Sequence, residues 1–263
     1  MPLKGKICFL SIDVEADFGQ KQGPFKGVDN LESILDIFQK VGVPATFFTT
    51  GRVLERYSKE FKEYAKTYEI ACHTFTHRFW NTLTQEEREK ELDRFLGLYR
   101  AVFNSSPFGF RAPSHIIDSD GLVLLEAKGF LYDSSVVPHY PFFKRYRGYR
   151  GRSPRSPYHP SLKDYKKQGA MKILELPTAG QLGGVPLAGA WISRLPHSFH
   201  KALLTLKKPD FLTVSMHPWD ALDFKGRTTR PERFLRNLEK LLTLLKEKNY
   251  QFLTGKQVFD KFQ

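Results

Sequence analysis

Cysteine is scarce in this chain of 263 residues, which has only Cys8 and Cys72. Two cysteines exclude a disulfide framework and are typical of reduced, buried thiols in a cytosolic protein. Long apolar runs are absent too, since no stretch approaches the roughly 20 residues of a membrane-spanning helix. The apolar stretch that ends at Asp13 is too short for a secretory signal. We therefore expect a cytoplasmic protein.

Acidic residues are outnumbered, with 28 Asp and Glu against 41 Lys and Arg and a formal net charge of +13. Part of the excess lies in residues 144–155, which contain Lys144, Arg145, Arg147, Arg150, Arg152 and Arg155. No nucleic-acid-binding motif accompanies this basic run, so we expect no nucleic-acid partner. A solvated loop, an anionic membrane surface and the phosphates of a lipid-linked glycan remain as interpretations of the run.

Short apolar runs alternate with helical patterns along the chain, which predicts an α/β fold built on a parallel sheet or barrel. We expect strands within residues 7–13, 45–49, 69–73, 109–111, 130–133, 171–176, 211–216 and 251–253. Two segments, 138–170 and 178–206, lack this alternation and predict elaborated loops. Without a clean boundary or repeat, residues 1–263 are expected to form a single catalytic domain.

Polar residues follow four of the expected strands. Asp13 and Glu15 come at the end of the first strand, and His73 and His77 come at the end of the third. Arg111 and His217 each stand at the end of a different later strand. Functional side chains of parallel α/β folds gather at the carboxyl ends of the strands, so these residues are expected in one cleft. One carboxylate and two imidazoles form the ligand set of a catalytic divalent metal such as zinc, and the second carboxylate is then a base for hydrolysis.

Cys72 is adjacent to His73 and is a metal-ligand candidate by proximity alone. If it ends a strand, its side chain faces away from that of His73, which argues against ligation.

Five motifs in order resemble the polysaccharide deacetylase superfamily, carbohydrate esterase family 4. They span 11–17 (Ser-Ile-Asp-Val-Glu-Ala-Asp), 73–77 (His-Thr-Phe-Thr-His), 109–114 (Gly-Phe-Arg-Ala-Pro-Ser), 132–135 (Tyr-Asp-Ser-Ser) and 215–219 (Ser-Met-His-Pro-Trp). The resemblance covers nearly the whole chain. It implies a distorted (β/α)7-type barrel with elaborated loops, and a metal-dependent hydrolase of non-peptide carbon–nitrogen bonds.

The first motif departs from the common form of this family, which has two adjacent aspartates, because Val14 separates Asp13 from Glu15. This spacing resembles a branch with an Asp-x-Asp or Asp-x-Glu block, which includes some peptidoglycan deacetylases and cyclic-amide hydrolases of the allantoinase type. In that branch the third position takes the metal. The resemblance thus implies Glu15, His73 and His77 as ligands and Asp13 as the catalytic base, with Asp17 as an outside candidate.

The resemblance also suggests roles for the later motifs. Arg111 would orient Asp13 and keep it ionised, and His217 would protonate the leaving amine, supported by either Asp133 or Glu175. Trp219 would wall the acetyl pocket or serve packing, and Pro113 is expected in substrate binding. The metal is expected to be zinc, with cobalt or nickel as alternatives.

The leading hypothesis is removal of N-acetyl groups from an acetylated amino sugar, oligosaccharide or polysaccharide. The alternatives are an allantoinase-like cyclic amide hydrolase on the same scaffold and a non-catalytic carbohydrate-binding relative. Asp13, Arg111 and His217 together favour an enzyme, because a binding module needs no acid–base pair. The sequence leaves the chain length of the glycan and the oligomeric state open.

Overall fold

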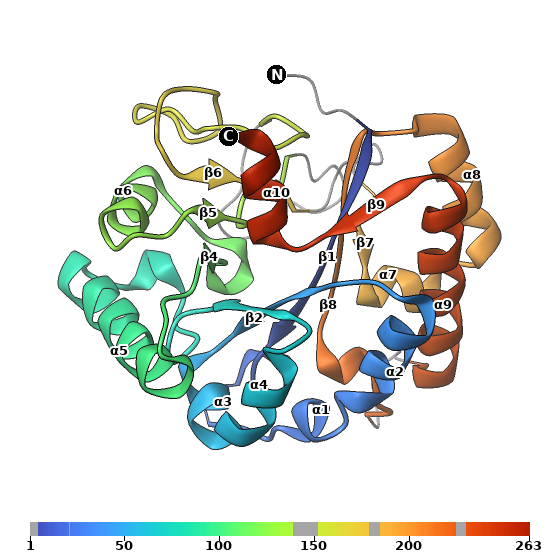
Figure 1. The fold of residues 1–263 in the computed structure, drawn as a ribbon, viewed down its shortest axis with the longest axis horizontal. Coiled ribbons are helices and arrows are strands. Elements are labelled where there is room, and N and C mark those ends of the chain that lie inside the picture. Colours follow the sequence, from blue (N-terminus) through green and yellow to red (C-terminus); the bar gives the residue numbers. More distant parts are fainter. Residues whose placement is uncertain (1–4, 21, 139–151, 179–184, 225–229) are drawn as a thin grey trace.

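A parallel sheet of nine strands forms the centre of the protein in the described residues (Figure 1). The computed structural model describes residues 5–20, 22–138, 152–178, 185–224 and 230–263. The strands are β1 (Lys6–Val14), β2 (Thr46–Thr49), β3 (Glu69–Cys72), β4 (Gly109–Phe110), β5 (Tyr132–Asp133), β6 (Leu174–Glu175), β7 (Leu187–Ala188), β8 (Phe211–Met216) and β9 (Tyr250–Leu253).

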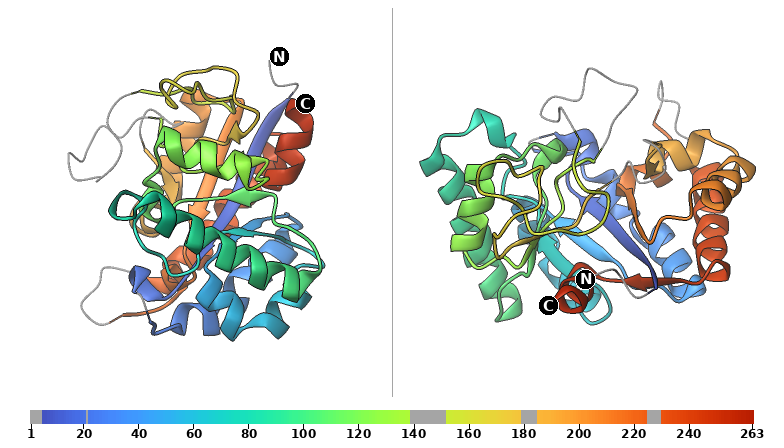
Figure 2. Two further views of the ribbon diagram at one scale, coloured as in Figure 1. Left: turned by 90° about the vertical axis from the view of Figure 1, so that its left-hand side faces the viewer. Right: turned by 90° about the horizontal axis from the view of Figure 1, so that it is seen from above.

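Helices surround the sheet (Figures 1 and 2). The α-helices are α1 (Lys26–Asp29), α2 (Glu32–Val41), α3 (Gly51–Arg56), α4 (Ser58–Tyr64), α5 (Gln85–Phe103), α6 (Ser119–Ala127), α7 (Gly189–Arg194), α8 (His197–Lys207), α9 (Pro231–Glu247) and α10 (Gly255–Phe262). Four short 3-10 helices follow strands or loops, namely η1 (Asp17–Gly19), η2 (Trp80–Thr82), η3 (Pro113–His115) and η4 (Pro218–Ala221). Within the described residues, no helix combines the length and the apolar character needed to cross a membrane.

The strand order is β6-β5-β4-β3-β2-β1-β8-β7, with β9 paired to the first half of β1. The pairs are parallel throughout, as in a curved half-barrel of alternating strands and helices. Among the described residues β6 and β7 do not pair, so the barrel is open at that side. The expected α/β architecture, a distorted barrel of the (β/α)7 type, is confirmed.

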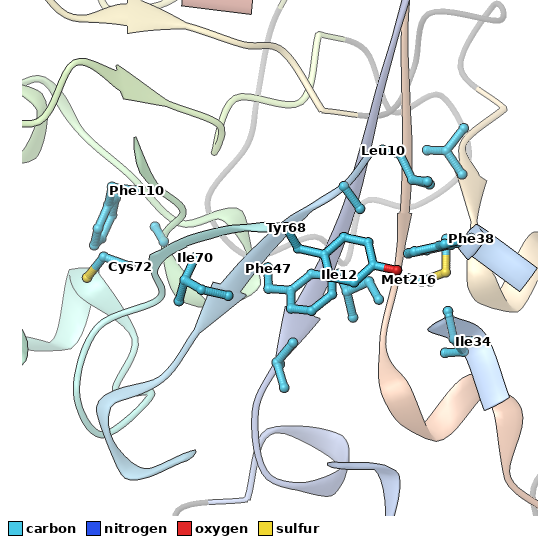
Figure 3. Packing of buried hydrophobic residues seen from close by; sticks show 14 of the residues in the cluster. Leu10, Ile12, Ile34, Phe38, Phe47, Tyr68, Ile70, Cys72, Phe110 and Met216 are labelled. Carbon is cyan, nitrogen blue, oxygen red and sulfur yellow. The ribbon is translucent and has the colours of Figure 1, made fainter. Parts of the chain in front are cut away.

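Strand β1 is apolar on both faces because it is covered on both. Cys8, Leu10 and Ile12 point into the core between the sheet and the helices, which Figure 3 shows in part. Ile7 and Phe9 point into a second cluster inside the barrel, where the Phe9 ring packs edge-on against Phe48 and Tyr132. Each fully buried side chain of this size contributes about 1.5–3 kcal/mol to folding.

The helices begin where local chemistry favours them. Thr84 and Glu87 form the capping box of α5: Thr84 Oγ1 accepts the Glu87 N–H at 3.2 Å, and the Glu87 carboxylate accepts the Thr84 N–H at 2.9 Å. Helix α9 buries Leu238, Leu241, Leu242 and Leu245 along one stripe, which is the period expected of a helix packed on a sheet.

The two segments without a clear pattern differ in the structure. The described part of 138–170 contains only isolated bridges, Tyr158 with Glu175 and Pro160 with Gln168. The segment 178–206 contains β7, α7 and most of α8. Of the six basic residues in the run 144–155, Arg152 and Arg155 are described, and both are exposed. The other four lie outside the described residues, and so does the expectation of a solvated or anion-binding loop that rests on them.

Candidate active site

Three potential metal ligands converge beyond the carboxyl ends of β1 and β3. Glu15 follows β1 directly, His73 follows β3 directly, and His77 lies in the loop that continues from it. One ligand atom from each lies within 4.8 Å of the other two. Glu15 Oε2 lies 3.2 Å from His73 Nε2, and His77 Nε2 contacts the same oxygen. Because β1 and β3 are parallel, their carboxyl ends share one edge of the sheet, which brings these residues together.

The surroundings of the three residues suit a cation. His73 Nδ1 lies 2.7 Å from the Arg111 carbonyl oxygen, which can only accept, so Nδ1 carries the proton and Nε2 presents its lone pair to the centre. Glu15 Oε2 is buried and has no hydrogen-bond donor in the described residues. A carboxylate oxygen in that position, with imidazole nitrogens beside it, fits a divalent metal ion with open positions.

The electrostatics of Glu15 agree with this assignment. Burial alone would raise the pKa of Glu15, but His77 and His73 outweigh that effect and hold it well below its ordinary value. Burial likewise would lower the pKa of His73, but the neighbouring carboxylates of Glu15 and Asp13 outweigh that effect, so that its pKa is raised.

The backbone around the centre is held in unusual conformations. Five residues that are not glycine have positive φ here, namely Phe18, Thr74, His77, Ser114 and His115. Such strain is maintained by local hydrogen bonds. Thr74 Oγ1 accepts the His77 N–H at 3.1 Å, and Glu91 of α5 accepts the N–H groups of Phe75 and Thr76 at 3.0 and 2.8 Å.

Glycine is required beside His77. Gly19 has a φ of +70°, and a Cβ at this position would lie 2.9 Å from His77 Cε1. A side chain there would displace the imidazole from the centre. Asp17, the outside candidate for a ligand, is not part of the cluster: its two carboxylate oxygens accept the N–H groups of Gly27 and Lys26 at 2.8 and 2.9 Å.

Asp13 lies next to the metal-ligand cluster, and Arg111 holds it in place. Arg111 is fully buried, and its Nη1 donates to Asp13 Oδ1 at 2.5 Å and to Ser11 Oγ at 3.0 Å. Its Nε and Nη2 donate to the carbonyl oxygen and the hydroxyl of Ser134 at 2.9 and 2.8 Å, and the guanidinium stacks over Phe48. Burial would raise the pKa of Asp13, but the Arg111 charge above all lowers it below its ordinary value. Asp13 is therefore ionised and positioned as a proton acceptor.

His217 follows β8 and faces the cluster from the other side. Its Nε2 lies 3.8 Å from Glu15 Oε1, and its ring stacks on Trp219 with centroids 4.2 Å apart. On the Nδ1 side of the ring lies the carboxylate of Asp220, whose Oδ2 accepts the His217 backbone N–H at 2.9 Å and is 3.9 Å from Nδ1. The His-Pro-Trp-Asp sequence carries this signal, since residue i+3 of a short helix reaches back to residue i.

The two carboxylates expected to support His217 have other partners. Asp133 accepts from the N–H and the hydroxyl of Ser135, and Glu175 Oε1 accepts the Val136 N–H at 2.9 Å. Burial raises the pKa of both, and the Asp133 charge raises that of Glu175 further. In the described residues their contacts do not include His217, and the carboxylate beside its Nδ1 is that of Asp220.

A cavity of about 320 Å³ opens over these residues. Its lining residues are Asp13, Glu15, Phe18, Gly19, His73, His77, Phe79, Ser114, His115, His217 and Trp219. Phe18, Phe79, Ser114 and His115 are not among the residues for which the sequence predicts a role in the site. Pro113 is buried at the first position of η3, and the two residues after it line the cavity instead.

Cys72 lies on the opposite side of its strand, as expected. It is fully buried in the core near Ile70 and Phe110 (Figure 3). Burial raises the pKa of its thiol, so the side chain is inert.

Comparisons with known proteins agree with this geometry. Residues 13–132 match the family described as polysaccharide deacetylase. A peptidoglycan deacetylase-like protein of Gibberella zeae is 35% identical over 120 residues, 44% of this chain and 36% of that protein. A peptidoglycan deacetylase of Helicobacter pylori is 26% identical over 183 residues, 68% of this chain and 62% of that protein. The chain thus spans about a third and about three fifths of the length of these two relatives.

Solved structures show the same fold. A polysaccharide deacetylase structure from Mycobacterium smegmatis superimposes with a TM-score of 0.69 at 20% identity, covering 99% of this chain and 91% of that chain. An allantoinase shares the fold with a TM-score of 0.68 at 15% identity, covering 100% of this chain and 92% of that chain. So does a pseudoenzyme of carbohydrate esterase family 4 from Bacillus anthracis, with a TM-score of 0.62 at 18% identity, covering 98% of this chain and 66% of that chain. The sequence match over residues 13–132, a little under half of the chain, and the shared barrel lead to one conclusion: this chain resembles the polysaccharide deacetylase family.

Proposed function

We propose that this protein is a divalent-metal-dependent deacetylase that hydrolyses the N-acetyl group of an acetylated amino sugar within an oligosaccharide or polysaccharide. The observation that carries the proposal is the convergence of Glu15, His73 and His77 on one cavity beside the Asp13–Arg111 pair. A bound divalent ion supplies Lewis-acid polarisation of the amide carbonyl and lowers the pKa of a water molecule. Zinc suits two imidazoles and one carboxylate, and cobalt or nickel would accept the same set.

The base is Asp13. Its carboxylate is ionised because Arg111 lowers its pKa, and it borders the cavity in which the water and the amide must meet. It accepts a proton from the attacking water as the new carbon–oxygen bond forms. The fixed contacts of Arg111 hold this carboxylate in one orientation, so that no reorganisation is needed when the proton moves.

The proposal includes a main-chain donor for the developing oxyanion. Arg111, Ala112, His115 and Ile116 each donate their N–H to a protein acceptor. The Ser114 N–H has no such acceptor among the described residues, and Ser114 lines the cavity in a left-handed conformation. Its N–H donates to the oxyanion in our proposal.

His217 completes the reaction by donating a proton to the leaving amine, so that the carbon–nitrogen bond breaks to give acetate and a free amino sugar. Asp220 stabilises the protonated ring, since its carboxylate lies beside Nδ1, and the Trp219 ring restricts its orientation. Trp219 also walls the part of the cavity in which the acetyl methyl group would lie.

Aromatic rings at the edge of the cavity fit a sugar substrate. Phe79 is 38% exposed and packs edge-on against the His77 ring. Phe18 has a left-handed backbone and lies against Trp219 with centroids 5.3 Å apart. Exposed rings at a cavity edge stack on the apolar faces of pyranose rings.

The test begins with the metal content of the purified protein, followed by acetate release from N-acetylglucosamine oligomers with and without a chelator. We expect about one divalent ion per chain, and acetate release that stops on chelation and returns with zinc. Ring opening of allantoin without acetate release would instead support a cyclic amide hydrolase, which the Asp-x-Glu spacing at 13–15 also favours. An absence of bound metal after incubation with zinc, cobalt and nickel would support a non-catalytic relative and refute the proposal.

A further inference from the structure

Helix α8 has an apolar stripe that the described residues cover only in part, because Leu203 packs against the core whereas Phe199 and Leu206 are exposed. Its inner face, His200 and Leu204, is buried where α8 contacts α9. Phe199, Ala202, Leu203 and Leu206 follow the spacing i, i+3, i+4, i+7 and therefore form a second stripe on one side of the helix. Phe199 is 38% exposed and Leu206 is 77% exposed. A large exposed leucine beside an exposed phenylalanine is a recognised mark of an interaction surface.

Basic residues surround the stripe. Lys201, Lys207 and Lys208 are exposed, and among the described residues none of them forms an ion pair. Lys248, at the end of α9, donates to Thr205 Oγ1 of α8 at 3.2 Å, which brings a fourth ammonium group to this helix. Residues 197–208 contain no acidic residue. Exposed lysines without carboxylate partners favour an anionic partner.

We propose that α8 docks this protein peripherally on an anionic phospholipid surface. Phe199 and Leu206 enter the boundary between headgroups and acyl chains, and the four lysines contact the lipid phosphates. A second copy of the chain is the poorer occupant, because a symmetric contact would bring the lysines of both copies together. One short apolar stripe is also small for a stable protein–protein interface.

The position of α8 leaves the cavity of the candidate active site accessible to water. Helix α8 ends at Lys207, shortly before β8 begins at Phe211, whereas His217 follows the other end of that strand. In Figure 1, α8 lies at the opposite end of the sheet from α1 and α3, which lie near the carboxyl ends of β1 and β2. Docking through α8 therefore leaves the cavity open to water, and no part of this inference depends on the proposed hydrolysis.

The experiment measures cosedimentation of the full chain with vesicles of phosphatidylglycerol mixed with phosphatidylcholine, and with vesicles of phosphatidylcholine alone. One variant carries Phe199→Ser and Leu206→Ser, and its matched control carries Leu162→Ser, an exposed leucine (65%) elsewhere in the chain. A second variant carries Lys207→Gln and Lys208→Gln. Its control carries Lys59→Gln and Lys62→Gln on α4, so that variant and control have the same net charge.

We expect binding to the anionic vesicles only, weakened about fivefold for each α8 lysine removed and at least about tenfold by the paired serine substitutions. The two controls should bind like the unmodified chain. All four variants alter exposed side chains and should unfold at the same temperature as the parent, which shows that any loss of binding is local.

Absence of binding to anionic vesicles at low salt would overturn the proposal. Equal binding by the serine variant and its control would also overturn it, since adsorption would then depend on charge alone. Sedimentation that reveals a dimer abolished by the serine substitutions would identify a second copy as the occupant and refute lipid docking.

Discussion

Replacement of Arg111 by methionine should destabilise the protein strongly, because it leaves the Asp13 carboxylate buried without its partner. Arg111 is fully buried and Asp13 is 5% exposed, so water can replace only a small part of the lost interaction. Removing one partner of a buried ion pair costs about 3–5 kcal/mol. That is a large part of the roughly 5–15 kcal/mol by which most domains are stable.

The loss should depend on pH in a direction that the structure determines. In the parent the folded pKa of Asp13 is lowered, so its contribution to stability is present above the unfolded pKa of about 3.9 and is lost only as pH falls through the lower folded pKa. Without Arg111, burial raises the folded pKa of Asp13 above the unfolded one, and the variant gains stability as pH falls. The free-energy difference between parent and variant should therefore be largest near about pH 8 and smaller near about pH 5.

Guanidinium unfolding of the parent and the Arg111→Met variant at both pH values measures this difference. Asp13→Asn in the Arg111→Met background serves as the control, because a neutral amide removes the unpaired charge while keeping the shape. We expect the double variant to recover part of the stability near pH 8 and to lose the pH dependence. An equal loss of stability at both pH values, with no recovery in the double variant, would refute the argument that Arg111 acts by compensating the charge of Asp13.

The remaining predictions concern the cavity. His73→Ala should abolish metal loading and hydrolysis together, since it removes one of three ligands; elemental analysis with an acetate assay checks this, and retained stoichiometric metal would exclude His73 as a ligand. Asp13→Asn should keep the metal but lower kcat about 10²- to 10⁴-fold; near-normal turnover would show that another group is the base. Asp220→Asn should lower kcat about tenfold at constant metal content; an unchanged kcat would leave Asp220 with a structural role only. Phe79→Ala should raise KM for oligomers about two- to tenfold with little change in kcat, as expected for the loss of one aromatic contact; an unchanged KM would remove Phe79 from the binding surface.

Much of the site follows from the sequence because parallel strands have a simple geometric property. Asp13, Glu15, His73 and His217 each stand at or just beyond the end of an apolar run, and the carboxyl ends of parallel strands meet at one edge of the sheet. Their convergence therefore needed only the correct assignment of strands. The alternation of side chains along β3 likewise predicted that Cys72 would face the core, on the side away from His73.

Other contacts depended on how loops fold back over the sheet. Asp220 lies beside His217 because η4 forms directly after β8, whereas Asp133 and Glu175 pair within the barrel wall. Phe18 and Ser114 border the cavity with backbones in positive φ, a conformation that residue type does not predict for either. The outer stripe of α8 also needed the structure, since an apolar i, i+3, i+4, i+7 pattern is usually buried.

The sequence by itself determined the family motifs, their order and the strand ends at which the polar residues stand. Those features are local, because each follows from residues close together in the chain. The tertiary structure alone decided which carboxylate serves His217, which aromatic rings border the cavity and which apolar face of α8 stays exposed. Those features depend on contacts between segments far apart in the sequence, whose relative positions are set by the packing of the whole barrel.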